Sequence, residues 1–241
     1  MRPLDRIPRA AAPAWRVAAL SALAVLPAFA DAVTLSPVRV DVTPTQPVAT
    51  LTVSNPGSTP MRFQAQVLAW GQRDGVDQRE ASDDLIVAPG IADIPAGGRQ
   101  IFRIAARSPA SGAERAYRLV LEDIGEAAPA EGGASAIRLR INHDLPVFVT
   151  PAGLAPAKLV LTPCAKPAPA CVRVRNDGDT HGVVRSLHFD GADWRKDHPV
   201  NARILAGAWR EWQVDAPASV QVTGVRATLG NGEPPLALSR R

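Results

Sequence analysis

The five residues Ala49-Thr50-Leu51-Thr52-Val53 alternate apolar and polar side chains with a period of two. Because successive side chains of a β-strand point to opposite faces, this pattern predicts a strand that is buried on one face and exposed on the other. The same alternation precedes it in Val38-Arg39-Val40-Asp41-Val42. Asn55-Pro56-Gly57 then ends the strand with residues that favour turns. This part of the chain is therefore a series of half-buried strands.

Similar stretches recur along the rest of the chain, with turn residues about every ten positions and no helix of ordinary length. A polar loop is expected at residues 71–84, a longer one at residues 125–135, and a linker at residues 151–156. The pattern predicts an all-β protein made of two β-sandwich domains, residues 31–152 and 153–241. The first strand is predicted at residues 33–35. Further strands are predicted at residues 63–70, 85–88, 91–94, 100–104, 116–122, 136–149, 158–161, 172–175, 182–189, 202–205, 209–214, 219–226 and 236–238.

The N-terminus has the pattern of a secretory leader. A basic stretch ends at Arg16, an apolar run covers residues 17–26, and Ala28-Phe29-Ala30 supplies the small residues of a cleavage site. We expect a signal peptide at residues 1–30, cleaved after residue 30 or 32, and a mature protein in an oxidising compartment. The alternative is an uncleaved anchor, but the apolar run is shorter than the roughly 20 residues that a spanning helix needs. We expect no membrane insertion.

The charge does not favour a nucleic-acid partner. The formal net charge is +4, but Arg2, Arg6, Arg9 and Arg16 all lie in the predicted leader. The remaining chain is close to neutral and lacks the basic stripe that phosphate contacts require.

The two cysteines, Cys164 and Cys171, flank a proline-rich turn between two predicted strands. We expect them to form a structural disulfide that clips a β-hairpin. The alternative is redox or metal chemistry, which the spacing does not favour because it is not Cys-x-x-Cys and no histidine is close in sequence.

No motif of a known catalytic or cofactor site is found, and we expect no enzyme activity, no cofactor and no metal. The histidines are scattered through different predicted strands and loops. His181 and His188 would be metal ligands only if the fold brought them together. The neighbouring acids Glu122 and Asp123 are expected to point to opposite faces of a strand, which does not favour a shared acid-base role.

The segment at residues 136–142 suggests how the protein works. Ile137, Leu139 and Ile141 form one apolar stripe, and the residues between them are polar. One interpretation is a last strand that buries this stripe in its own sandwich. The other is an edge strand that offers the stripe, with unpaired main-chain groups beside it, to another protein. The long loop before it would let such a strand lengthen when a partner binds.

These features, taken in order along the chain, resemble the periplasmic chaperones of the chaperone-usher pilus pathway. The resemblance covers almost all of the mature chain. Its last motif is similar to the more divergent, archaic-type branch of the family. The motifs that carry the resemblance are Leu35-Ser36-Pro37-Val38-Arg39, Leu51-Thr52-Val53-Ser54-Asn55, Ile101-Phe102-Arg103-Ile104, Glu114-Arg115-Ala116-Tyr117-Arg118-Leu119, Ile137-x-Leu139-x-Ile141 and Leu145-Pro146-Val147-Phe148-Val149-x-Pro151.

Together with the alternation, the resemblance implies two immunoglobulin-like β-sandwich domains joined at an angle. It also implies a chaperone of the periplasm that caps pilin-like subunits by donating a β-strand and delivers them to an outer-membrane usher. By position, Ile137, Leu139 and Ile141 are the donated side chains. Strand donation of this kind is a known mode of β-augmentation. It would also cover a subunit edge that is prone to aggregation. The free protein could cap itself as a dimer in the same way.

The resemblance also implies a pair of basic residues that binds the C-terminal carboxylate of the subunit. Arg39 matches the first of them, although it could be an ordinary polar residue of a strand. The chain departs from the family at the second, where Pro146 stands. Arg103 or Arg140 is then the candidate for the second anchor, or Arg39 acts alone. Arg103 and Glu114 match further family positions, for which we expect a structural role.

Two rival functions remain open. The first is a pilus structural subunit or an adhesin-like binding protein, which should lack its final strand. Here, in contrast, a final strand is predicted for the first sandwich. The second is a secreted hydrolase, which would require a convergent Ser, His and acid set that nothing in the sequence locates.

Overall fold

The computed structural model describes residues 33–125, 140–165, 168, 170–217, 219–230 and 234–239. Within these residues the regular structure is all β-strand, as the alternation predicted. Among them no helix is long and apolar enough to cross a membrane. The predicted leader at residues 1–30 lies outside the described residues, so its cleavage stays a prediction.

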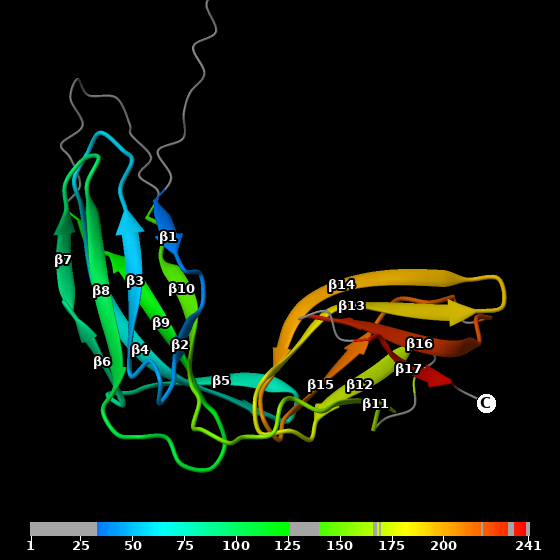
Figure 1. Ribbon diagram of the computed structural model, residues 1–241. Coiled ribbons are helices and arrows are strands. Elements are labelled where there is room, and N and C mark those ends of the chain that lie inside the picture. The colour runs from blue at the N-terminus through cyan, green and yellow to red at the C-terminus, as the bar shows by residue number, and fades with distance from the viewer. Residues whose placement is uncertain are drawn as a thin grey trace, which may run out of the picture. The chain divides into compact units, whose positions relative to one another are not determined.

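Strands β1 to β10 form the two facing sheets of the first sandwich (Figure 1). One sheet has the order β1-β3-β8-β6, and the other has the order β2-β10-β9-β4-β5 with β7 paired to β4. The strands are β1 Thr34–Ser36, β2 Val40–Val42, β3 Val48–Ser54, β4 Met61–Arg73, β5 Val76–Ala81, β6 Leu85–Ala88, β7 Ile91–Ile94, β8 Arg99–Ala106, β9 Arg115–Asp123 and β10 His143–Val149.

The core of the first sandwich lies between these sheets. In β3, Ala49, Leu51 and Val53 are buried while Val48 and Thr50 are exposed, as the opening alternation predicted. Phe63, Phe102, Tyr117 and Leu119 are among the largest fully buried side chains, and they come from β4, β8 and β9. Each buried side chain of this size contributes roughly 1.5–3 kcal/mol relative to the exposed state.

The first strand of the sandwich is divided between the two sheets. β1 pairs antiparallel with β3 in one sheet, and β2 pairs parallel with β10 in the other. The predicted strand at residues 38–42 is therefore too long, because Val38 and Arg39 lie in the crossing between β1 and β2. Val38 is 74% exposed there.

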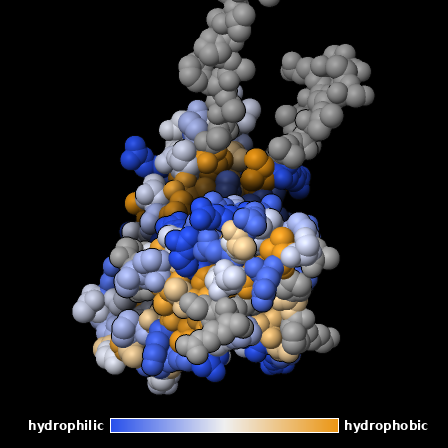
Figure 2. Space-filling model, turned by 90° about the vertical axis from the view of Figure 1, so that its right-hand side faces the viewer, coloured by the Kyte–Doolittle hydropathy of each residue, from blue (hydrophilic) through white to orange (hydrophobic). Residues whose placement is uncertain are grey.

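Strands β11 to β17 form the second sandwich, with sheet orders β11-β12-β15 and β14-β13-β16-β17. The disulfide predicted between Cys164 and Cys171 is present, and it closes the connection between β11 and β12. Viewed as in Figure 2, hydrophilic residues lie between scattered apolar ones, as on an ordinary protein surface. The strands are β11 Leu159–Pro163, β12 Cys171–Asn176, β13 Gly182–Gly191, β14 Arg195–Ile204, β15 Trp209–Gln213, β16 Val222–Leu229 and β17 Leu236–Ser239.

One polar strand and most of a second were not predicted. The loop expected at residues 71–84 is wrong, because β4 continues to Arg73 and β5 pairs with it over Val76–Ala81. Asp74 and Gly75 join the two strands with φ of 53° and 79°, the positive angles of a two-residue hairpin turn. β14 also starts earlier than predicted, at Arg195. The cause is the same in both strands: their side chains are largely exposed, so they lack apolar alternation.

The predicted strand at residues 136–149 is confirmed only from His143 onward. Arg140, Ile141 and Asn142 form no strand, so the prediction is wrong for these three residues. Residues 136–139, which include Ile137 and Leu139, lie outside the described residues.

Each sandwich contains the same buried asparagine corner. The side-chain amide of Asn55 donates to the carbonyls of Thr59, Ile94 and Pro95, and its oxygen accepts from the amide of Gly57. In the second sandwich, Asn176 donates to the carbonyls of Thr180, Ile204 and Leu205 and accepts from the amide of Gly178. Both side chains satisfy buried backbone groups where a strand ends, and so hold a neighbouring loop in place.

Residues Asp31–Arg241 cluster as one compact unit, and named contacts join its two sandwiches. Gln72 in β4 donates to the carbonyl of Arg203 and accepts from the amide of Leu205. Asp77 in β5 forms an ion pair of 2.7 Å with Arg210. A small apolar cluster of Trp70, Phe148, Leu205 and Ala208 packs beside these bonds. The predicted linker at residues 151–156 lies between β10 and β11, and the domain limits at residues 152 and 153 stay a prediction.

Candidate protein-binding site

Strand β10 has one open flank. All seven of its residues pair with β9, but only Val147–Val149 pair with β2 on the other side. Among the described residues, the flank of residues 143–146 away from β9 therefore has no strand partner. Unpaired main-chain groups along such a flank are a template for another strand. Pro146 is the exception within it, since proline has no backbone N–H.

The open part of β10 is held by charged neighbours. Asp144 accepts from Arg118 on β9 at 2.6 Å and from Arg79 on β5 at 2.8 Å. Arg118 also lies over the ring of Trp70, 5.0 Å from its centroid. Hydrogen bonds between an arginine and a carboxylate are stronger than those between neutral groups, and they restrict the relative orientation of the two side chains. This network fixes the start of β10 against the sheet.

His143 opens the strand on the same flank. Burial lowers the pKa of His143, against the opposing effect of Asp123. Its ring lies 6.0 Å from that of Phe63. The neutral imidazole is therefore favoured at this position, which keeps the first residue of the open flank uncharged.

Just before the strand, the apolar stripe is not sealed inside the protein. Ile141 is 55% exposed. Arg140 donates a hydrogen bond to the carbonyl of Gly125. The interpretation in which the whole stripe is buried in its own sandwich is thus wrong for Ile141.

A cavity of about 500 Å³ lies beside the beginning of β2, and residues of both sandwiches line it. Arg39 lines it and is 44% exposed, with its Nε donating to Asp41 at 2.9 Å. The lining residues are Pro37, Val38, Arg39, Val40, Asp41, Gln46, Ala49, Thr50 and Arg203. Neither Arg103, on β8, nor Arg140 is among them.

Arg203, on β14 of the second sandwich, was missed as a candidate from the sequence. Its Nε is buried and has no hydrogen-bond partner. Burial lowers the pKa of Arg203, and the nearby charges of Arg118, Arg39 and Arg185 lower it further, against the opposing effect of Asp41. Arg203 thus lies in a region of positive charge. No sequence signal indicated this, because residue 203 is far from residue 39 along the chain.

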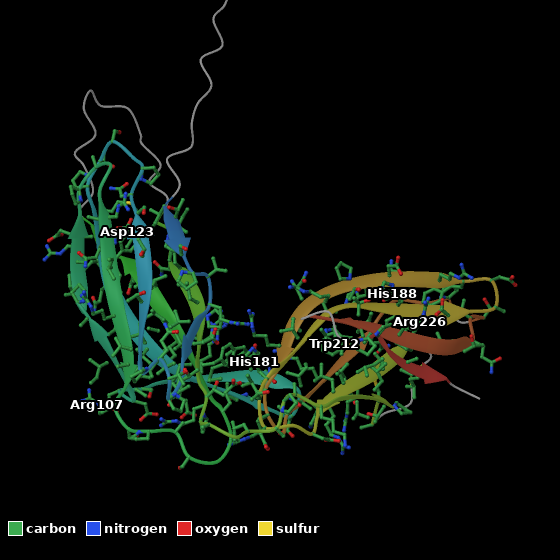
Figure 3. The ribbon with its side chains drawn as sticks, in the orientation of Figure 1. Arg107, Asp123, His181, His188, Trp212 and Arg226 are labelled. Atoms are coloured by element: carbon green, nitrogen blue, oxygen red, sulfur yellow. A yellow bond between two sulfur atoms is a disulfide. The ribbon has the colours of Figure 1, made fainter. Side chains whose placement is uncertain are left out.

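Glu114 has the structural role that was expected. It is 5% exposed, and it accepts from the backbone amide of His181, bonds to the His181 ring at 2.7 Å and accepts from the hydroxyl of Thr150. Burial acts to raise the pKa of Glu114, but these hydrogen bonds and the charge of His181 outweigh it and hold the pKa below its usual range. The ring of His181 (Figure 3) stacks on Phe148 at 3.6 Å. Glu114 therefore links the two sandwiches.

A hydrogen-bonded Ser-His-Asp set lies on the second sandwich, although the sequence did not locate one. His188 (Figure 3) lies 2.9 Å from Ser186 Oγ and 2.7 Å from Asp197. The same Nε2 that faces Ser186 is also 3.1 Å from Thr228. Asp197 is 82% exposed, whereas the acid of a catalytic triad is buried and orients the histidine. We interpret this set as a polar cross-strand cluster.

His181 and His188 are not brought together into a metal site, since they bond to Glu114 and Asp197 respectively. Among the described residues, one group has the spacing of metal ligands: Cys164, Cys171 and Glu211. Its two sulfur atoms are joined in the disulfide, so they do not offer thiolates, the form in which cysteine binds metals.

The fold has two sandwiches. In the first of them, the first strand is divided between the sheets and the last strand, β10, has an open flank. These features define a class of proteins that can bind a partner along a strand edge. The chain belongs to the family of pili and flagellar-assembly chaperones, because the model of the PapD N-terminal domain matches residues 32–155. This confirms the family resemblance and the pilus-chaperone function expected from the sequence. No curated protein sequence matches the chain.

Solved structures of similar fold come from several bacteria. The Acinetobacter baumannii CsuC-CsuE complex, a chaperone with a tip adhesion subunit of archaic Csu pili, gives a TM-score of 0.66 at 14% identity, over 86% of this chain and 97% of that chain. The Salmonella enterica SafA pilin in complex with the SafB chaperone gives 0.62 at 16% identity, over 87% and 96%. The Escherichia coli chaperone DraB gives 0.59 at 17% identity, over 87% and 97%. At these identities the similarity concerns the fold, and it supports two immunoglobulin-like sandwiches.

Proposed function

We propose that this chain works in the periplasm, binds pilus subunits through the open flank of β10, and passes them to an outer-membrane usher. The observation that carries the proposal is the flank at residues 143–146, which has no strand partner among the described residues and continues into the exposed Ile141. A subunit that lacks one strand of its own sandwich would pair there. The leader at residues 1–30 would direct the chain to that compartment, and the sandwich at residues 31–152 would hold the subunit.

The donated side chains in this proposal are Ile137, Leu139 and Ile141. Each aliphatic side chain that enters an apolar groove contributes roughly 1.5–3 kcal/mol. The strand hydrogen bonds would satisfy main-chain groups on both partners at the same time. Arg39 would bind a carboxylate of the subunit, since a guanidinium can donate two parallel hydrogen bonds to it. The same open flank also permits a self-capping dimer of the free protein.

The test is co-expression with the neighbouring gene products, followed by pull-down of the complex. Leu139→Glu should leave the chaperone folded and abolish capture, because a charge would enter the apolar groove. Ile101→Glu is the matched control, because Ile101 is an aliphatic residue that is 41% exposed on β8 and away from β10. Capture by Leu139→Glu at the level of the wild type, with native stability, would contradict strand donation.

The same experiment separates the chaperone from the rival functions. A chaperone should give a defined complex with a subunit, whereas a structural subunit should join chains of its own kind. Arg39→Ala should weaken capture and preserve the fold. Unfolding of this variant would instead support a purely structural role for Arg39.

A further inference from the structure

The cavity between the Pro37–Asp41 segment and β14 contains more positive than negative charge. Two of its lining residues, Arg39 and Arg203, are cations, and one, Asp41, is an anion. Arg118 and Arg185 add positive charge close to Arg203. The bond to Asp41 uses the Nε of Arg39. The lining thus has a net positive charge, which favours binding of an anion.

Arg203 lacks the partners that a half-buried arginine normally has. Its Nε is buried without a hydrogen-bond partner. Among the described residues, no carboxylate lies within ion-pair distance of it. Burying a charge without a partner is costly, and neighbouring cations add to the cost. A bound anion would offset both, and its site would be the cavity that Arg203 lines.

The rest of the cavity wall indicates an anion carried on an apolar chain. Pro37 and Val38 line the cavity together with the two arginines, whereas the lining residues Val40 and Ala49 are buried in the core of the first sandwich. Val38 is 74% exposed at this point. A free inorganic anion would gain nothing from such a wall, whereas the last residues of a polypeptide would bury apolar surface against it.

The cavity also lies where a guest strand on β10 would end. β2 begins at Val40, opposite Val147, and it occupies the same flank of β10 that is open at residues 143–146. A guest strand on the open flank is therefore in line with β2, and its end lies beside Arg39. A C-terminal carboxylate at this end would meet the arginines, whereas an N-terminal ammonium group would be repelled by them.

We propose that Arg203 of the second sandwich and Arg39 of the first together bind the C-terminal carboxylate of the guest chain. This inference rests on the proposed function, and it assigns the second anchor to Arg203 in place of Arg103 or Arg140. The anchor then spans both sandwiches, so carboxylate binding requires the arrangement that Glu114 and His181 hold together.

The inference is tested with the full chain and an acetylated ten-residue peptide of alternating valine and threonine, made with a free C-terminal carboxylate and as its amide. The wild type should bind the acid about 10- to 100-fold more tightly than the amide, which is the effect of hydrogen bonds to a charged group. Arg203→Gln should remove most of this preference by lowering affinity for the acid. Arg203→Lys should keep part of it, because the charge remains.

Arg195→Gln is the matched control, since Arg195 lies on the same strand and its side chain is 87% exposed. It should bind acid and amide as the wild type does. Thermal unfolding of each variant shows whether it is folded. Equal binding of acid and amide by the wild type, or an unchanged preference in folded Arg203→Gln, would overturn the inference. Competition by inorganic phosphate as strong as that by the acid would overturn the assignment to a chain terminus.

The subunit pull-down separates this inference from the function on which it rests. Failure of the wild type to capture any subunit would contradict the proposed function. Capture that is normal in the wild type and equally strong in Arg203→Gln would contradict only the role of Arg203.

Discussion

The two sandwiches share one buried corner and use it differently. The sequences Val53-Ser54-Asn55-Pro56-Gly57-Ser58-Thr59 and Val174-Arg175-Asn176-Asp177-Gly178-Asp179-Thr180 have Val, Asn, Gly and Thr at matching positions. In both, the asparagine side chain donates to three carbonyls and accepts from the amide of the glycine two residues on. After the threonine, the first corner has Pro60, whereas the second has His181, which bonds to Glu114. The asparagine and the glycine thus stabilise the fold of each sandwich. The residue after the threonine can form a contact with the other sandwich.

The largest expected effect comes from removing the shared asparagines. Asn176→Ala and Asn55→Ala each leave buried carbonyls without a donor, and we expect each to lose about 3 kcal/mol of unfolding free energy. Asn176→Ala should lose more, because Asn176 also accepts from the amide of Lys158. Urea unfolding measures both. Asn142→Ala, at an exposed position, is the control. If either Asn55→Ala or Asn176→Ala lost less unfolding free energy than this control, the two corners would not have the same structural role.

A smaller loss of stability is expected in the second sandwich alone, because only this sandwich has a disulfide. The bond joins cysteines 7 residues apart, and closing so short a loop stabilises by about 2 kcal/mol in the chain-entropy account. The double variant Cys164→Ser, Cys171→Ser should lower the stability of the second sandwich. Trp194, Trp209 and Trp212 all lie there, so tryptophan fluorescence in urea follows it. An unchanged midpoint would show that β11 and β12 do not depend on the bond.

The smallest effect concerns the contact that the second corner makes. Glu114→Gln keeps the shape of the side chain but removes its charge, and we expect a loss of about 1 kcal/mol. The pKa of Glu114 is lowered from 4.5 in the folded protein, so the charged form is stabilised by folding. Its contribution is present above pH 4.5 and is lost as the pH falls through the lower folded pKa. The stability difference between wild type and variant, measured in urea from pH 7 to pH 3, should shrink over that range. A difference that stays constant would mean that the carboxylate charge does not contribute.

Sequence alternation predicted the strands that bury one face. β3 and β8 are examples, since Leu51 and Phe102 point inward and their neighbours point outward. It failed for β5 and for the first half of β14, whose side chains are largely exposed. A strand without a buried face has no reason to alternate. The Asp74-Gly75 pair was the available signal for the hairpin of β4 and β5, because these residues favour positive φ.

The candidate site was predicted only in part, for a different physical reason. The resemblance indicated Arg39, and Arg39 lines a cavity beside β2, but its role as a carboxylate anchor stays a prediction. Arg203 has an ordinary position in a polar strand. It becomes a candidate binding residue only because the packing of the second sandwich brings it to that cavity. That residues 39 and 203 line the same cavity depends on how the two sandwiches pack, which local sequence pattern does not reveal. Ile137 and Leu139 lie outside the described residues, so their role stays a prediction.

The short strand β2 has one further consequence. It pairs with the last three residues of β10, so in the proposed binding mode it would act as an end stop for a strand that pairs with residues 143–146. A client whose terminal segment is one residue too long would have to shift its register, and a shift of one residue turns every side chain to the opposite face. Clients would then be selected by length as well as by chemistry.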